Sequence, residues 1–285
     1  MQGVFAIRYI ETDTITNVVA KLCIEANYYL PEDVLQAIQT FKEKEISEIG
    51  RDILAQLIQN QEIARAQKVP ICQDTGMAVV FVELGQDVHI NGDLYQALND
   101  GVAKGYKEGY LRKSIVADPF LRANTGSNTP AVIHIKLVPG DKLKITVAPK
   151  GGGSENMSAV KMLKPADGME GVEDFILKTV EEAGPNPCPP IVIGVGIGGT
   201  MEKAALLAKE ALLRPLGSRS PHQHIAAMEE RLLEKINKLG IGPQGFGGSV
   251  TALGVNIEVF PCHIASLPVA VNINCHVSRH MSAEI

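Results

Sequence analysis

The hydrophobic residues in the first quarter of the chain recur at the spacing of an α-helix, and this pattern stops at Pro70. Three successive segments show it, each with an apolar stripe on one face. The first segment follows Thr14, a residue type that caps helices, and the second has Pro31 at its predicted first position. The stripes comprise Ile15, Val18, Val19, Leu22 and Ala26; Val34, Leu35, Ile38 and Phe41; and Ile49, Ile53, Leu54, Leu57 and Ile58. They predict a layer of three helices, and Pro70 predicts a change of direction after it.

Beyond Pro70, alternating or continuously apolar runs indicate strands. The runs at 133–137 and 143–147 alternate on either side of Pro139-Gly140-Asp141, which predicts a β-hairpin. Other strands are predicted at 79–84, 191–195, 255–259 and 269–273, and other helices at 93–110, 157–163, 172–182, 201–213 and 225–239. We therefore expect an α+β fold, in which a helical layer packs on mixed, largely antiparallel β-sheets within a single domain over residues 1–285.

Charge and hydropathy exclude some classes of protein. The chain has 27 Lys and Arg against 32 Asp and Glu, a formal net charge of -5, and no dense basic cluster interleaved with aromatic residues. A nucleic-acid partner is therefore not expected. No apolar run reaches the roughly 18 residues of a membrane span, and the first residues do not resemble a targeting peptide. A cytoplasmic location without membrane contact is the expectation.

Glycines occur in two patterned groups. Gly194, Gly196 and Gly199 satisfy G-x-G-x-x-G between a predicted strand and a predicted helix, the context of a dinucleotide-binding turn. However, no strand with an acidic end follows about 20 residues later, so NAD binding is disfavoured, although the helix start still suits an anion. In the helix predicted at 93–110, glycines at 101, 105 and 109 lie on one face and predict close approach of another backbone.

The five cysteines stand in different contexts. Cys23 belongs to the first helical stripe and is expected in the core, and Cys262 at a strand end is expected to be structural. Cys72, Cys188 and Cys275 stand in a polar loop, a proline-rich loop and a strand end, where each is either a buried thiol or a metal ligand. Paired short spacings typical of zinc are missing from the sequence. Three thiolates are the set that a 4Fe-4S cluster needs when one iron stays open to a substrate.

Four motifs resemble one enzyme family: PICQDTG at 70–76, GGGSEN at 151–156, CPPIVIGVGIGGT from Cys188, and NINCHVSRH around Cys275. Together they resemble the alpha subunit, or N-terminal region, of the class I iron–sulfur fumarate hydratase and tartrate dehydratase group. The resemblance covers nearly the whole chain. It implies that Cys72, Cys188 and Cys275 each bind one iron of a 4Fe-4S cluster, whose fourth iron binds the substrate and acts as a Lewis acid.

The resemblance also implies groups that bind the substrate. Arg112 matches a family position that grips a carboxylate, and a guanidinium has the bidentate geometry for this. Gln73 directly follows a ligand cysteine and can reach a substrate on the open iron. The backbone amides of Gly152 and Gly153 are candidates for binding a substrate carboxylate. Without the resemblance, Arg112 would be read as a solvated surface residue.

Two residues are candidate catalytic groups. Asp74 follows Gln73 and faces the same substrate, although it can instead cap a local turn. His263 matches a family position near the active site, where it would assist proton transfer; otherwise a histidine at a strand end is more often structural. His276 and His280, near Cys275, are candidate hydrogen-bond donors to the cluster.

The family implies a partner. Its one-chain members continue into a second region, which supplies the proton-abstracting group and further carboxylate contacts. We therefore expect a beta subunit, an α2β2 assembly and interconversion of fumarate and (S)-malate, with L(+)-tartrate dehydration as the alternative reaction. A cluster-binding redox or iron sensor and a purely structural α+β domain are the alternatives from other classes.

Overall fold

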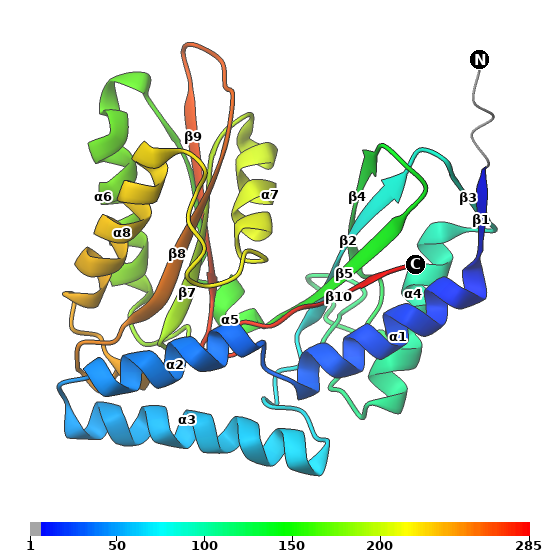
Figure 1. The fold of residues 1–285 in the computed structure, drawn as a ribbon, viewed down its shortest axis with the longest axis horizontal. Helices are drawn as coiled ribbons and strands as arrows, with labels where there is room; N and C mark the ends of the chain where they lie inside the picture. The colour runs from blue at the N-terminus through cyan, green and yellow to red at the C-terminus, as the bar shows by residue number, and fades with distance from the viewer. Residues whose placement is uncertain (1–6) are drawn as a thin grey trace. The chain divides into compact units, whose positions relative to one another are not determined.

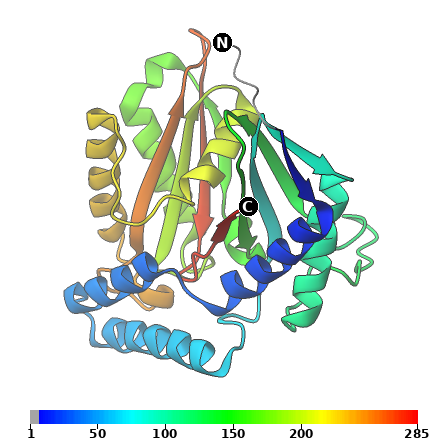
Figure 2. The same ribbon diagram turned by 45° about the vertical axis from the view of Figure 1, so that its right-hand side comes forward.

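The structure, a computed structural model, describes residues 7–285 and divides them into two compact units. The first unit contains the residues up to Tyr29 together with Ile63–Gly151 and Arg279–Ile285. The second contains Leu30–Glu62 and Gly152–Ser278. Figures 1 and 2 show the helices and strands coloured along the chain. Among the described residues, no helix combines the length and the apolar character needed to span a bilayer.

A mixed four-stranded sheet forms the centre of the first unit. Its order is β10-β5-β2-β4, with β10 at Met281–Glu284, β5 at Leu143–Lys150, β2 at Met77–Gly85 and β4 at Val132–Val138. Helix α1 (Thr12–Tyr28) packs against β5 and against α4 (Leu94–Glu108). Strands β1 (Arg8–Glu11) and β3 (Val88–Asn91) form a short parallel pair. The strand predicted at 79–84 and the helix predicted at 93–110 are confirmed.

The hairpin predicted around Pro139-Gly140-Asp141 is wrong. Strand β2 lies between β4 and β5, parallel to β4 and antiparallel to β5. The connecting loop crosses the end of β2, where the amide of Gly85 donates to the carbonyl of Lys142 over 2.8 Å. A Cβ on Gly85 would stand 2.3 Å from the carbonyl oxygen of Gly140, so this crossing requires glycine. Alternation and a turn sequence indicate where two strands lie, but not which strand pairs with each.

Gly101 and Gly105 of α4, together with Gly109 directly after it, face α1, as predicted for close backbone approach. A Cβ on Gly105 would lie 2.6 Å from the carbonyl oxygen of Ala20 and 2.9 Å from the Cβ of Cys23. Cys23 is fully buried in this contact, and burial raises the pKa of its thiol to about 12. The prediction that Cys23 is a core residue is therefore confirmed.

The second unit has a mixed sheet with helices on both faces (Figure 1). The sheet order is β6-β9-β7-β8, with β6 at Ala159–Leu163, β9 at Leu267–Asn274, β7 at Ile191–Gly198 and β8 at Ala252–Phe260. Helix α7 (Met201–Ala211) covers one face, and α6 (Gly168–Ala183) and α8 (Gln223–Asn237) cover the other. Helix α2 (Glu32–Lys44) packs against β8. The predicted α+β class is confirmed.

One predicted helix of this unit is a strand. Residues 157–163 include β6, which pairs antiparallel with β9 from Ala159 opposite Val271 to Leu163 opposite Leu267. A short apolar run has no distinctive period, so pairing with a distant strand decides its conformation. A short 3₁₀ helix, Pro165–Asp167, then leads into α6.

The G-x-G-x-x-G segment has a packing explanation in the structure. Gly194 and Gly196 lie inside β7, where α7 crosses the sheet. A Cβ on Gly194 would lie 2.2 Å from the carbonyl oxygen of Ala208, and a Cβ on Gly196 would lie 2.0 Å from that of Ala204. These glycines therefore allow the helix backbone to contact the strand.

The three helices predicted before Pro70 are confirmed, including α3 (Glu48–Gln67). The predicted buried face of α3 is right for Leu54, which is fully buried. It is wrong for Ile49, which is 59% exposed. Periodicity identifies the apolar face of a helix, but not how far along the helix its packing partner extends.

A buried carboxylate holds the connection between α2 and α3. Glu45 is 2% exposed and accepts hydrogen bonds from the amides of Ser47 (2.9 Å), Ser249 (2.9 Å) and Val250 (2.8 Å). Burial by itself would raise the pKa of this carboxyl group. The hydrogen bonds from these three amides outweigh burial, so the pKa of Glu45 lies below its ordinary value. The ionised side chain therefore ties α2 to the segment that precedes β8.

We expect Glu45→Gln to lower the free energy of unfolding by about 2 kcal/mol at neutral pH, because charge-assisted hydrogen bonds are lost. The pKa of Glu45 is lower in the folded than in the unfolded chain. Its contribution is therefore present above the unfolded value, about 4.3, and is lost as pH falls through the folded value. Urea unfolding at several pH values measures the effect. The exposed Glu43→Gln is the control, and equal pH dependence of wild type and Glu45→Gln would contradict the assignment.

Candidate functional site

The segment Pro70–Gly76 connects α3 to β2 and presents the polar side chains predicted to act on a substrate. Gln73 is exposed and Cys72 is half-buried, whereas Ile71 and Thr75 are buried. The amide of Ile71 donates to the carbonyl of Asn27 in the last turn of α1 over 3.0 Å. Buried residues therefore anchor the loop while Cys72 and Gln73 remain accessible.

Three buried side chains donate hydrogen bonds to the carbonyls of residues 74–76. Arg279 donates from Nη2 to the first carbonyl over 2.6 Å. The hydroxyl of Tyr106 lies 2.8 Å from the second and 3.0 Å from the third, and Asn128 donates to the third over 3.2 Å. We call Arg279, Tyr106 and Asn128 the carbonyl clamp. Because its members are fixed by their own burial, the clamp holds the loop in one conformation.

Asp74 forms a local turn, the alternative that the sequence left open. Its Oδ1 accepts a hydrogen bond from the amide of Gly76 over 3.0 Å. Gly76 has a φ of 69°, and a Cβ there would lie 2.7 Å from the backbone of Lys150, so the turn requires glycine. The turn-capping reading is confirmed, and a catalytic role for Asp74 stays a prediction.

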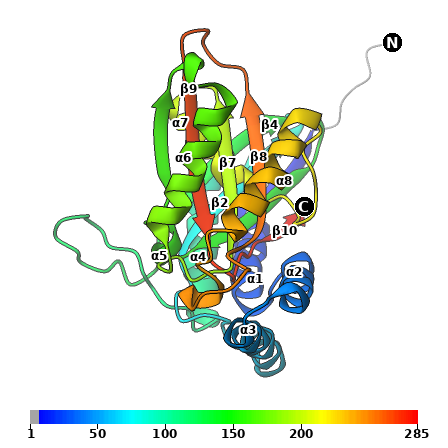
Figure 3. The same cartoon turned by 90° about the vertical axis from the view of Figure 1, so that its left-hand side faces the viewer.

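Arg112 stands close to this loop in the long connection between α4 and β4, which Figure 3 shows projecting from the helix. The hydroxyl of Thr75 donates to the backbone carbonyl of Arg112 over 3.1 Å. The Arg112 residue itself is exposed. The first unit therefore brings a solvent-accessible guanidinium into the neighbourhood of Cys72, Gln73 and Asp74.

Cys188 and Cys275 lie at one end of the sheet in the second unit. Cys188 precedes the start of β7, and Cys275 follows the end of the antiparallel neighbour β9. The carbonyl of Cys188 accepts hydrogen bonds from the amide (3.4 Å) and the ring Nδ1 (3.1 Å) of His276. Cys188 also has a φ of 55°, a left-handed conformation that costs energy for a non-glycine residue. Two of the three predicted ligands are thus brought together, with His276 bound to the backbone of one.

Gly152 and Gly153 begin the short helix α5 (Gly152–Glu155) and are exposed. A Cβ on Gly152 would meet nothing within 4 Å, and a Cβ on Gly153 would meet only the carbonyl oxygen of Asn186, at 3.8 Å. Asn186 stands two residues before Cys188, so Gly153 lies beside the Cys188 loop. The described residues leave open space at both glycines.

A polar network beneath α5 was missed by the sequence prediction. Glu155 accepts hydrogen bonds from Lys209 of α7 (2.5 Å) and Asn272 of β9 (2.7 Å). Asn272 also donates to the hydroxyl of Ser158 over 2.9 Å. The network fixes the GGGSEN segment to the sheet. The sequence signal for this network was Asn272, a polar residue within the apolar strand that precedes Cys275, because a buried amide needs hydrogen-bond partners.

His263 does not lie with Cys188 and Cys275. It stands in the connection from β8 to β9 and lines a cavity of about 370 Å³ with residues at the start of α7. The eight residues of β7 separate this end of the sheet from the cysteine end, about 25 Å at the rise of a strand. Cys262, predicted to be buried, is exposed in the same connection, so that prediction is wrong. A residue directly after a strand lies beyond the end of the sheet, where packing of neighbouring elements need not bury it.

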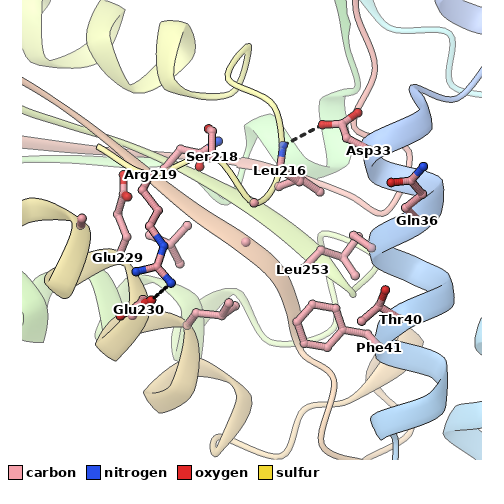
Figure 4. Close-up of a pocket in the computed structure, with 17 residues that line it drawn as sticks. Asp33, Gln36, Thr40, Phe41, Leu216, Ser218, Arg219, Glu229, Glu230 and Leu253 are labelled. Atoms are coloured by element: carbon pink, nitrogen blue, oxygen red, sulfur yellow. Dashed lines mark hydrogen bonds and ion pairs between the residues drawn. The ribbon is translucent and has the colours of Figure 1, made fainter. Parts of the chain in front are cut away.

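Another cavity of about 380 Å³ in the second unit contains none of the predicted site residues (Figure 4). It lies among α2, α8 and β8, with a mainly apolar lining. Asp33 accepts a hydrogen bond from the amide of Leu216 over 2.7 Å, and Arg219 pairs with Glu230. These contacts already use the polar groups named, so the cavity offers little for binding a charged substrate.

Three of the cysteines have the donor chemistry of iron–sulfur ligands. Within residues 7–285, no three side chains of His, Cys, Asp or Glu converge on a point that would hold one ion. A 4Fe-4S cluster does not need such convergence, because each iron takes its own thiolate. Cys72, Cys188 and Cys275 all have accessible surface in ordered loops, whereas Cys23 is fully buried. The donor chemistry of these three residues therefore fits the group.

A sequence model of the family described as fumarate hydratase (fumerase) matches residues 16–284. The chain belongs to the fumarate hydratase family. A Methanocaldococcus jannaschii protein, provisionally named L(+)-tartrate dehydratase subunit alpha, is 46% identical over 93% of this chain and 95% of its own length. L(+)-tartrate dehydratase alpha subunits from Escherichia coli strains UTI89 and K12 are 36% and 35% identical, over 93% of this chain and 88% of theirs. As a member of the fumarate hydratase family, the chain is a carbon–oxygen hydro-lyase.

We expect Tyr106→Phe to loosen the Cys72 loop. Burial raises the pKa of the Tyr106 phenol, so the hydroxyl stays protonated and donates at neutral pH. Its loss leaves buried carbonyls short of a donor, at a cost of about 1–3 kcal/mol. Hydrogen exchange at residues 72–76 should therefore become faster in the full chain. Tyr95→Phe, at an exposed position of the same helix, is the control; unchanged exchange in Tyr106→Phe would refute the clamp.

Proposed function

We propose that this chain is the alpha-type subunit of an iron–sulfur hydro-lyase that interconverts fumarate and (S)-malate. Cys72, Cys188 and Cys275 are the proposed ligands of a 4Fe-4S cluster, and residues 1–285 are proposed to act as one catalytic domain. The observation that carries the proposal is the carbonyl clamp, because it holds the accessible Cys72 and Gln73 in place with buried donors.

A bound cluster would supply a Lewis-acidic iron that stabilises the charge on the departing hydroxide. The chain's own residues bind and orient the acid. The exposed guanidinium of Arg112 is proposed to bind one carboxylate in bidentate fashion. Gln73 is proposed to hydrogen-bond the substrate, and the amides of Gly152 and Gly153 to bind the second carboxylate, for which the open space at these glycines leaves room.

Asp74 and His263 are proposed as the catalytic groups of this chain. The turn formed with the amide of Gly76 fixes the orientation of the Asp74 carboxylate, which would align the reacting hydroxyl. His263 stands about 25 Å from Cys188 along β7, so its proton transfer would have to serve the site of another copy. An α2β2 assembly would allow this.

A beta subunit is proposed to complete the site. The relatives described above are named alpha subunits, which supports a second chain here. That chain would contribute the group that removes the proton and further contacts to the carboxylates. The α2β2 stoichiometry and the cytoplasmic location expected from the sequence stay predictions.

L(+)-tartrate is the competing substrate, because the relatives named above carry its name while the family carries that of fumarate hydratase. We expect the anaerobically reconstituted alpha–beta complex to turn over (S)-malate, and the alpha chain alone to be nearly inactive. Comparing kcat/KM for malate and tartrate decides between them. A higher kcat/KM for tartrate would make tartrate the preferred substrate instead of malate. Full activity of the alpha chain alone would contradict the proposal that a beta subunit completes the site.

Replacing the proposed ligands tests the cluster separately from activity. We expect Cys72→Ser, Cys188→Ser and Cys275→Ser each to lose most of the bound iron and sulfide after anaerobic reconstitution, since each removes the thiolate of one iron. Cys262→Ser is the matched control at an exposed thiol, and Cys23→Ala is the control for a buried one. Equal iron retention in all five variants would refute the ligand set. A cluster spectrum unchanged by malate in wild type would favour a sensor.

A further inference from the structure

Arg279 is the one charged member of the carbonyl clamp, and it is only 5% exposed. Its Nη2 donates to the carbonyl of Asp74, but its Nε is buried without a hydrogen-bond partner. The first unit therefore contains a buried guanidinium that is held by one main-chain carbonyl through Nη2 and has an unsatisfied Nε.

Such a charge is costly, because a buried cation loses its hydration and normally gains an anion in exchange. Arg214 in the second unit shows the usual arrangement, with Nη1 2.9 Å from Glu229 and 3.3 Å from Glu258. Among the described residues, the hydrogen-bond partner found for Arg279 is the carbonyl of Asp74. The Asp74 carboxylate lies in the same surroundings, because the charges of Arg279 and Asp74 move the pKa of Tyr106 in opposite directions.

We propose that Arg279 is a positioning residue of the cluster site, whose guanidinium fixes the Asp74 carbonyl and whose charge stabilises the negative charge that thiolates and a bound dicarboxylate bring to this loop. The inference rests on the proposed function and adds to it a residue outside the ligand and substrate-binding set. Arg279 stands four residues after Cys275, and the carbonyl that it holds stands two residues after Cys72. An anion bound at the completed site would be stabilised by this buried guanidinium.

Two substitutions separate position from charge. Arg279→Lys keeps the positive charge but loses the planar guanidinium with its fixed N–H donors. Arg279→Gln keeps an N–H donor but loses the charge. Arg8→Gln is the matched control in the same unit. The Arg8 guanidinium also donates to two main-chain carbonyls, of Asp141 (3.1 Å) and Ile285 (2.8 Å), but in exposed positions.

The positioning role is measured on the full chain without a cluster. We expect hydrogen exchange at residues 72–76 to become about tenfold faster in both Arg279 variants, because a charge-assisted hydrogen bond to the loop is weakened or lost. Arg8→Gln should leave it unchanged. Exchange at the wild-type rate in both Arg279 variants would overturn the positioning role.

The charge is measured by the reduction potential of the cluster in the reconstituted alpha–beta complex. Reduction adds negative charge, so Arg279→Gln should shift the midpoint to a lower potential, while Arg279→Lys should stay near wild type. Equal shifts in both variants, or none in either, would overturn the charge role. If Arg279→Gln does not fold, Arg279→Met serves as the uncharged variant. Wild type that takes up no iron would refute the proposed function, whereas the exchange result would still decide the positioning role.

Discussion

Three buried donors meet the carbonyls of residues 74–76, and the candidate site of the first unit depends on this contact. The donors come from α4, from the connection before β4 and from the segment before β10. The loop conformation is therefore set by the tertiary structure of the whole unit. Gly76 and the Asp74 turn then direct the chain into β2, which leaves Cys72 and Gln73 accessible.

The sequence predicted what local chemistry determines. Helical stripes located α1, α2 and α3, and the glycine face of α4 predicted close contact with another backbone, which the structure identifies as α1. Cys23 lies in the core as its stripe predicted, whereas the ligand role of Cys72, Cys188 and Cys275 stays a prediction, because Cys262 has accessible surface as well. The turn formed by Asp74 could also be predicted from the sequence, because Asp followed two residues later by Gly is a turn signal.

Non-local contacts decided the rest. Residues 157–163 became a strand because β9 was available to pair with them, and no local period announces that. The same holds for Arg279 and Tyr106, whose importance comes from carbonyls roughly 30 to 200 residues away in the chain. His263 shows a further limit. A sequence motif gives no position in space. His263 lies at the opposite end of the sheet from Cys188, separated from it by the length of β7.

The interleaved order β10-β5-β2-β4 bears on how the first unit folds. Strands β4 and β5 are joined by a short loop but separated by β2, so the sheet cannot begin as a local hairpin and must assemble through pairings distant in sequence. Its last strand, β10, pairs with β5 only after the intervening residues of the second unit have been made. The second unit also depends on the end of the chain, because its interior strand β9 ends at Asn274, shortly before β10 begins. Neither sheet can therefore be completed until the last residues of the chain have been made.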